Sequence, residues 1–284
     1  METKEELIDQ LLDLSFAEDI GDGDHTTLST IPADAMGRQH LLVKEEGILA
    51  GVDIARRVFE KFDPSLKMTV FINDGAHVRP GDIAFVVEGP VRSLLQTERL
   101  MLNIMQRMSG IATLTARYQD RLSGLDCKVL DTRKTTPGMR ILEKEAVRIG
   151  GGHNHRIGLF DMILIKDNHV DFAGGIAKAV KSAKDYCAAK GKDLRIEVEV
   201  RNTDEIHQAI EAGVDRIMLD NFDPERTREA VEIIRRLAPG VEIESSGGIT
   251  FDTLRAYGEA GVDFISVGAL THSVKGLDLS FKAC

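Results

Sequence analysis

The chain has 284 residues, which suggests about two domains or one large α/β domain. Hydrophobic residues make up 43% and charged residues 29%, ordinary values for a globular protein that buries a core without a metal or disulfide staple. Lys and Arg total 36 against 46 Asp and Glu, and the net charge of -10 argues against nucleic-acid partners and against attachment to an anionic membrane.

Three sequence features point to the cytoplasm. No apolar run reaches the ~18–20 residues of a membrane span. The first ten residues, METKEELIDQ, are acidic and amphipathic, unlike a signal peptide. Cys127, Cys187 and Cys284 lie far apart, which argues against a disulfide framework or a thiolate zinc site. We therefore expect a cytoplasmic protein.

The first hundred residues predict mixed α and β structure. Apolar spacing indicates a helix over 4–18, followed by the turn-rich loop GDGDHTT. Strand-like runs come next at 39–44, 47–50 and 67–72, with a helix over 52–62 between the last two. Glycines and a proline punctuate NDGAHVRPGDIAFVVEG, which suggests β-hairpins. A long helix is predicted over 92–122, with Ser109-Gly110 as the place for a break.

The pattern changes near residue 100, which is the best boundary candidate. Beyond it, short apolar runs ending in polar residues alternate with helical stretches near 140–149, 174–189, 203–212, 223–237 and 251–260. The runs are CKVLDTRK, DMILIKDN, RIEVEV, RIMLDN, VEIESSGG and DFISVGAL. Nearly apolar strands that alternate with helices indicate a parallel sheet covered on both faces.

The residues that close these runs are Asp131, Lys166, Glu199, Asp220, Ser246 and Gly268. In an α/β barrel, the carboxyl ends of the strands form the active-site face. Six strands are fewer than a full barrel contains, so the barrel is incomplete or has a strand that the pattern hides.

A basic segment covers residues 131–169. It carries seven Lys and Arg against five Asp and Glu, a net +2, whereas the rest of the chain sums to -12. A local cluster of one sign favours a small anionic ligand, and arginine is suited to planar carboxylates and phosphates. The glycines of GGGHNHR would let a ligand approach the backbone closely.

Two acidic residues close neighbouring strands. Glu199 and Asp220 would both face one site, where they suit Mg²⁺, ribose hydroxyls or a developing positive charge. Glu197 has the same alternation as Glu199, and the sequence does not choose between them. Ser245-Ser246-Gly247-Gly248 and Gly268-Ala269 end the last two strands, where barrels commonly bind phosphate.

These segments also carry a resemblance. ERLMLNIMQRMSGIAT, DTRKTTPGMR, AVRIGGGHNHRIGL, LIKDNH, EVEV, IMLDN, ESSGGI and SVGALTHS together resemble the nicotinate-nucleotide pyrophosphorylase (carboxylating) family, also called quinolinate phosphoribosyltransferases. The resemblance extends to EDIGDGDHTT and GILAG in the first part. It implies an α/β fold: an N-terminal α/β sandwich over 1–101, with 269–284 packing back on it, and an incomplete, six- to seven-stranded catalytic α/β barrel over 102–268.

The resemblance also implies a reaction. Quinolinate and 5-phosphoribosyl 1-pyrophosphate, with Mg²⁺ as cofactor, would give nicotinate mononucleotide, pyrophosphate and CO₂ in de novo NAD synthesis. It further implies a homodimer, with higher oligomers open, in which the N-terminal domain of one subunit covers the barrel mouth of the other.

The resemblance assigns roles to named residues. Arg133, His155, Arg156 and Arg99 of the partner subunit would hold quinolinate, a planar dicarboxylate. Lys134 and Lys166 would meet the phosphates and the ring carboxylate. Glu199 and Asp220 would hold the ribose hydroxyls and Mg²⁺, directly or through substrate or water. The 5-phosphate would lie on Ser246, Gly247, Gly248 and Gly268, with His272 at the rim. The catalytic group would be Lys134, Lys166, Glu199 and Asp220.

Other functions stay open beside this one. Lys166 closes a barrel strand and could form a Schiff base, as in a barrel aldolase. A related phosphoribosyltransferase-like paralogue could act on another base. A catalytically silent sensor would bind both ligands without turnover.

Overall fold

The computed structural model describes residues 2–284, so that Met1 lies outside the description. The described residues fall into two compact units. One unit comprises the residues up to Ala116 together with Thr135–Gly151 and Ala269–Cys284, and the other comprises Arg117–Lys134 and Gly152–Gly268.

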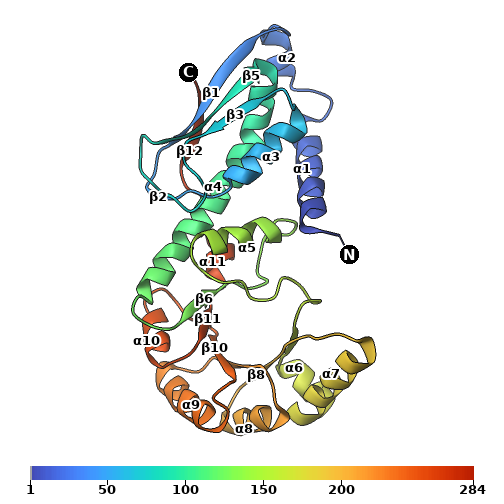
Figure 1. The fold of residues 1–284 in the computed structure, drawn as a ribbon, viewed down its shortest axis with the longest axis vertical. Helices are drawn as coiled ribbons and strands as arrows, with labels where there is room; N and C mark the ends of the chain where they lie inside the picture. The colour runs from blue at the N-terminus through green and yellow to red at the C-terminus, as the bar shows by residue number, and fades with distance from the viewer. Residues whose placement is uncertain (1) are drawn as a thin grey trace. The chain divides into compact units, whose positions relative to one another are not determined.

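The first unit is built on an antiparallel sheet with the strand order β12-β1-β5-β3 (Figure 1). Its strands are β1 (Met36–Val43), β3 (Lys67–Val70), β5 (Ile83–Pro90) and β12 (Leu279–Ala283). A two-stranded sheet pairs β2 (Gly47–Ile48) with β4 (His77–Val78). The helices are α1 (Lys4–Ile20), α2 (His25–Thr30), α3 (Val52–Phe62), most of α4 (Val91–Arg121), α5 (Arg140–Ile149) and α11 (Ala269–His272). The C-terminal strand β12 pairs with β1 and completes the main sheet.

Phenylalanine side chains join α3 to this sheet. The Phe59 ring of α3 lies 5.9 Å from that of Phe281 in β12 and 6.3 Å from that of Phe85 in β5, between centroids. The buried side chains of α3 recur every three or four residues, which places them on one face of the helix. The helix predicted over 52–62 is confirmed.

Two local predictions in this unit are wrong. The loop predicted at GDGDHTT holds the start of α2, because the Asp24 side chain accepts a hydrogen bond from the Thr27 N–H and caps a short helix. The segment over 73–89 forms no β4–β5 hairpin. The turn after β4 pairs instead with Val43, through Gly81 N–H to Val43 O and Val43 N–H to Asp82 O, and this directs β5 into the main sheet between β1 and β3.

Helix α4 continues through Ser109-Gly110 over its 31 residues, so the predicted break is also wrong. The Ser109 hydroxyl accepts from the Ala50 N–H and donates to the Ala50 carbonyl. A Cβ on Gly110 would lie 2.3 Å from the Lys275 carbonyl oxygen. The small residues therefore allow close packing against neighbouring backbone and do not interrupt the helix.

The second unit contains a parallel sheet with the strand order β6-β11-β10-β9-β8-β7 (Figure 1). Its strands are β6 (Lys128–Leu130), β7 (Ile163–Ile165), β8 (Ile196–Val200), β9 (Arg216–Asp220), β10 (Glu242–Ser246) and β11 (Phe264–Ser266). The helices are α6 (Asp167–Ala173), α7 (Ile176–Lys190), α8 (Thr203–Ala212), α9 (Pro224–Leu237) and α10 (Leu254–Glu259). All six predicted strands are present, and the α/β fold with an incomplete barrel is confirmed. The short helix α6 was not predicted.

The open edge of the barrel beside β6 carries a short extension. His153 forms an isolated parallel bridge with Leu130, in which its N–H donates to the Val129 carbonyl and its carbonyl accepts from the Asp131 N–H. The segment GGHNHR therefore runs alongside β6, and this placement brings His155 and Arg156 to the sheet.

The sequence Ala-Gly-Val-Asp occurs at 212–215 and again at 260–263, and both copies play the same part in the sheet. Gly213 and Gly261 have φ values of +67° and +95°, so each helix ends at a backbone conformation that favours glycine. The Asp215 carboxylate accepts from the Ile196 N–H and the Asp263 carboxylate from the Ile243 N–H, each at 2.7 Å. Each aspartate thus ties the start of its own strand to the preceding one.

None of the helices within residues 2–284 has the length and apolar composition needed to cross a membrane.

Candidate active site

The carboxyl ends of the six parallel strands lie along one edge of the second unit's sheet. The strand register pairs Asp220 with Ser246. It pairs Glu199 with Met218, which precedes Asp220 by two residues and lies on the same face of the sheet. Lys166 directly follows β7, and Asp131 directly follows β6. Parallel pairing therefore collects the polar residues that close the strands.

An ion pair joins two of these residues. The Lys166 Nζ lies 3.2 Å from Glu199 Oε2, and the Lys166 side chain is half exposed while that of Glu199 is buried. Burial raises the pKa of the Glu199 carboxyl, and this effect outweighs the opposing attraction of Lys166. A polar substrate that entered here would meet a positive charge and a carboxylate together.

The acidic pair at this edge fits a hard cation. The charge of Asp220 also raises the pKa of Glu199, so the two carboxylates are close enough to repel each other. The Asn221 amide donates to Asp220 Oδ2 at 2.7 Å and orients that carboxylate. Carboxylate oxygens are the ligands Mg²⁺ prefers, and a cation would relieve the repulsion. The donor set predicted for Mg²⁺ is therefore compatible with it.

Two arginines from different segments repel each other in the same unit. Burial lowers the pKa of the Arg156 guanidinium, and the positive charge of Arg133 lowers it further. The Arg156 Nη1 donates to the Met162 carbonyl at 3.4 Å, while Arg133 lies on the exposed loop after β6. A bound dianion would remove this repulsion, so the arrangement favours a substrate with carboxylates.

A buried aspartate fixes the backbone beside Arg156. Asp131 Oδ1 accepts from the His155 N–H at 2.9 Å, and Asp131 Oδ2 accepts from the Asn154 amide. The Asp131 side chain is fully buried. The segment after β6 therefore has two roles. It supplies Arg133, and through Asp131 it anchors the backbone next to Arg156.

The loop after β10 is shaped by glycine. Gly247 has φ of +98°, and a Cβ there would lie 2.3 Å from Asn221 Oδ1. Gly248 has φ of +63° and open space where a Cβ would be. Backbone of this kind presents N–H groups to an anion, which suits the predicted phosphate role of Ser246, Gly247 and Gly248. Gly268 follows β11, as predicted.

Lys134 ends a segment of the second unit, whereas Arg99 and His272 belong to the first unit. Arg99 is exposed on α4, and His272 is exposed at the end of α11, with its Nδ1 2.7 Å from the Ser273 hydroxyl. Lys134 is followed in the chain by a loop that the first unit holds. There, the buried Glu143 accepts from Arg107 Nε at 2.8 Å and from the Thr136 N–H at 3.1 Å.

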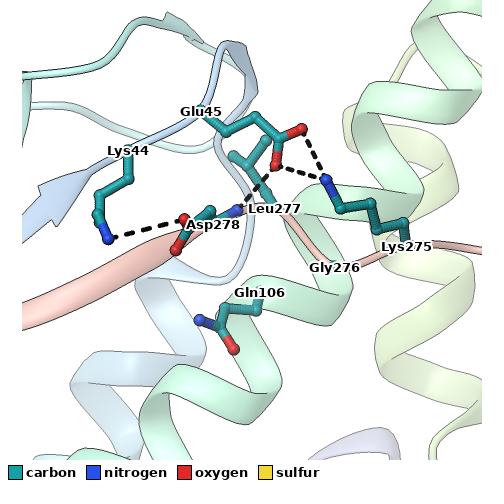
Figure 2. Close-up of a pocket in the computed structure, with 7 residues that line it drawn as sticks. All are labelled: Lys44, Glu45, Gln106, Lys275, Gly276, Leu277 and Asp278. Atoms are coloured by element: carbon teal, nitrogen blue, oxygen red, sulfur yellow. Dashed lines mark hydrogen bonds and ion pairs between the residues drawn. The ribbon is translucent and has the colours of Figure 1, made fainter.

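A separate hollow in the first unit is lined by charges that neutralise one another (Figure 2). Lys275 Nζ lies 3.2 Å from Glu45 Oε1, and the Asp278 N–H donates to Glu45 Oε2. Lys44 Nζ lies 3.8 Å from Asp278 Oδ2. Because these charges already pair with one another, the sheet edge is the better candidate for a substrate site.

Sequence analysis missed several residues that organise the edge. Asn154, Asn221, Arg216 and Glu244 were not singled out, and Asp131 was noted only as a strand end. The signal was available for Glu244 and Arg216, because charged residues at every second position of a buried strand are unusual. The roles predicted for the individual site residues stay predictions.

The fold and this edge define an incomplete α/β barrel that gathers charged residues at the carboxyl ends of its strands. Models of the quinolinate phosphoribosyl transferase family match residues 24–109 (N-terminal domain) and 111–282 (C-terminal domain). The chain belongs to this family, and the family resemblance seen in the sequence is confirmed.

Individual relatives agree over nearly the whole chain. A quinolinate phosphoribosyltransferase [decarboxylating] 1b from Nicotiana tabacum is 44% identical, over 96% of this chain and 81% of its own length. A probable nicotinate-nucleotide pyrophosphorylase [carboxylating] from Bacillus subtilis is 43% identical, over 95% and 91%. The solved nicotinate-nucleotide pyrophosphorylase from Francisella tularensis is 43% identical, with a TM-score of 0.92 over 100% of this chain and 98% of that one.

Proposed function

We propose that the chain converts quinolinate and 5-phosphoribosyl 1-pyrophosphate into nicotinate mononucleotide, pyrophosphate and CO₂, in de novo NAD synthesis. The observation that carries the proposal is one sheet edge that holds both charge types this reaction needs. Arg133 and Arg156 offer positive charge to a dicarboxylate, and Glu199 and Asp220 offer negative charge to a ribosyl cation. Membership of the family supports the same reaction.

Quinolinate would be bound through its carboxylates. Arg133 and Arg156 repel each other without a ligand, and a planar dicarboxylate would pair with both guanidinium groups. His155 and Lys166 would complete this set. The backbone hydrogen bond from His155 to Asp131 holds the segment in place, which lowers the cost of orienting the substrate.

The phosphoribosyl substrate would lie on the acids and on the glycine loop. Its 5-phosphate would meet backbone N–H groups at Ser246, Gly247, Gly248 and Gly268. Lys134 and Lys166 would face the pyrophosphate. Glu199 and Asp220 would accept hydrogen bonds from the ribose hydroxyls.

The reaction would proceed by dissociation. The bond between ribose C1 and the pyrophosphate oxygen breaks, and its electron pair leaves with pyrophosphate, near Lys134 and Lys166. Glu199 and Asp220 stabilise the oxocarbenium-like ribosyl centre. The lone pair of the quinolinate ring nitrogen then forms the C1–N bond. The bond to the 2-carboxylate breaks, its electrons pass to the positively charged ring, CO₂ leaves, and one proton adds at C2. The chain's part is positioning and electrostatics, with no covalent enzyme intermediate.

Magnesium belongs to this proposal as the cofactor. Glu199 and Asp220 would hold Mg²⁺, directly or through substrate or water, and the bound ion would offset charge on the pyrophosphate leaving group.

The assembly and location follow the same family pattern. The chain would form a homodimer in which Arg99 of the partner subunit reaches the quinolinate site, and the exposure of Arg99 on α4 supports this. A cytoplasmic enzyme, as predicted from the sequence, remains part of the proposal.

A Schiff-base aldolase is the less favoured function. The amine of Lys166 is ion-paired with Glu199 at 3.2 Å. An amine held by a neighbouring carboxylate is less available to attack a carbonyl.

The test is an assay of the purified protein with quinolinate, phosphoribosyl pyrophosphate and Mg²⁺. We expect nicotinate mononucleotide and CO₂ in equal amounts, and loss of both when EDTA removes the metal. Turnover of another base in place of quinolinate would favour a paralogue. Binding of both ligands without product would favour a silent sensor, and an adduct trapped on Lys166 by borohydride would favour an aldolase.

A further inference from the structure

A layer of buried charged residues, Glu197, Arg216 and Glu244, lies two to four residues before the carboxyl ends of their strands, beneath the site residues at that edge. Glu197 in β8 and Glu244 in β10 are completely buried, and Arg216 in β9 is 6% exposed. Side chains alternate along a strand, and the register sets Glu197 beside Arg216, so these residues share the sheet face of Glu199 and Asp220. The opposite face of the same strands is apolar apart from Ser245.

The layer is joined by short contacts that end at His155. Arg216 Nη1 lies 3.1 Å from Glu244 Oε2, and its Nε and Nη2 lie 2.9 and 2.8 Å from Glu242 Oε2. The His155 Nε2 lies 2.9 Å from Glu197 Oε2 and 3.4 Å from Glu244 Oε2. The imidazole thus bridges two buried carboxylates.

His155 is therefore held at both ends. Asp131 accepts a hydrogen bond from its backbone N–H at 2.9 Å, and the far side of its ring lies within ion-pair distance of Glu197 and Glu244. Arg156 is the next residue, and its N–H lies 2.7 Å from His155 Nδ1. A shift of this ring would move the start of the arginine that we place on the substrate.

We propose that Glu197, Glu244 and Arg216 are positioning residues for the quinolinate site, which fix the ring of His155 so that the next residue, Arg156, meets the substrate's carboxylates. This inference rests on the proposed function above. The three residues do not contact substrate themselves and act through His155.

Two observations favour positioning over other roles. His155, Glu197 and Glu244 have donor atoms that could hold a divalent cation, but Arg216 already supplies positive charge to Glu244 at 3.1 Å. Replacing a buried ion pair by apolar residues of similar volume is often neutral for stability, so stability alone does not account for these buried charges. Burial alone would lower the pKa of His155, yet the two glutamates raise it to about 9, which reflects how strongly they attract the ring's protons.

The test compares three variants that each remove one carboxylate charge from the same region: Glu197→Gln, Glu244→Gln and Glu242→Gln. Glu242 is the matched control, because it binds Arg216 and lies two residues before Glu244, while His155 contacts only the other two acids among these three. For Glu197→Gln and Glu244→Gln, we expect the KM for quinolinate to rise about tenfold, with the KM for phosphoribosyl pyrophosphate within about twofold of wild type. Glu242→Gln should raise the quinolinate KM less than either of these variants, because among the residues of this layer Glu242 contacts Arg216 and not His155.

A double-mutant cycle shows whether Glu197 acts through His155. In a His155→Ala background, Glu197→Gln should add no further change in quinolinate binding, measured by calorimetric titration. If Glu197→Gln does not fold, Glu197→Asp and Glu244→Gln serve instead; Glu197→Asp keeps the charge and should give a smaller rise in the quinolinate KM.

The outcomes separate this inference from the proposed function. If the wild-type protein does not turn over quinolinate, the proposed function is wrong. Suppose that the wild-type protein is active and that Glu197→Gln and Glu244→Gln fold. The positioning role alone is overturned if these variants keep the wild-type quinolinate KM, change both KM values equally, or match Glu242→Gln.

Discussion

Glu197 and Glu199 are two residues apart on one strand and one face, and their surroundings differ. Glu199 pairs with the half-exposed Lys166 at the edge, where a substrate can reach it. Glu197 is fully buried and pairs with His155. On the proposed function, Glu199 at the edge would meet the substrate, and Glu197, two residues earlier on the strand, would position a residue of the site. The predictions below test this division, from the largest effect to the smallest.

The largest effect is expected at the edge, from Arg133→Ala. Without this guanidinium, one carboxylate of quinolinate loses its charged partner, so the Kd for quinolinate should rise about 100-fold or more. Binding of phosphoribosyl pyrophosphate should largely survive. Calorimetric titration with each ligand measures both, and an unchanged quinolinate titration would mean that Arg133 has been assigned wrongly.

The two layers should differ in their effect on stability. Glu197→Ala leaves His155 with one buried carboxylate fewer and should lower the free energy of unfolding by about 3 kcal/mol. Glu199→Ala should lower it by less than about 1 kcal/mol, because its partner Lys166 is half exposed and stays solvated when left unpaired. Urea denaturation measures both, and equal losses would contradict the division into layers.

The fold was predictable from the sequence where the apolar pattern was strong. The six barrel strands are short apolar runs closed by polar residues, and all six are found. Helix α2 was hidden, because its first residues lie in a glycine- and aspartate-rich segment that resembles a turn. Ser109-Gly110 suggested a break, because the sequence does not reveal that Ala50 and Lys275 pack there.

The sequence predicted polar residues at the ends of the barrel strands, but it did not predict how their side chains are arranged. The sequence could not choose between Glu197 and Glu199, since their difference depends on His155, which reaches the sheet through the bridge between His153 and Leu130. That contact joins segments more than twenty residues apart, and nothing local specifies it.

The glycine loop should show a smaller, position-specific effect. Gly247→Ala places a Cβ 2.3 Å from Asn221 Oδ1 at φ of +98°, so the loop must shift, and the KM for phosphoribosyl pyrophosphate should rise about tenfold. Gly248→Ala is the control, with φ of +63° and open space, and should change that KM about twofold. Steady-state kinetics measure both, and an unchanged KM in Gly247→Ala would contradict the phosphate role of the loop.

The smallest effect is expected in the pH dependence of stability. The folded-state pKa of His155 is raised from 6.5 to about 9, so its contribution is complete below about pH 6.5 and is lost as the pH rises through about 9. The pKa of Glu197 is raised too, by burial and then by Glu244, and acts in the same direction. The Tm should fall between pH 7 and 9, and fall less in His155→Gln. If the Tm of the wild type and of His155→Gln changed identically with pH, the two glutamates would not hold a proton on His155 in the folded state.

The most direct test of the division into two layers is steady-state kinetics of Glu199→Gln beside Glu197→Gln. The account predicts crossed results: Glu199→Gln lowers kcat about 100-fold with the quinolinate KM nearly unchanged, and Glu197→Gln raises the quinolinate KM about tenfold with a smaller change in kcat. The same pattern in both variants would contradict it.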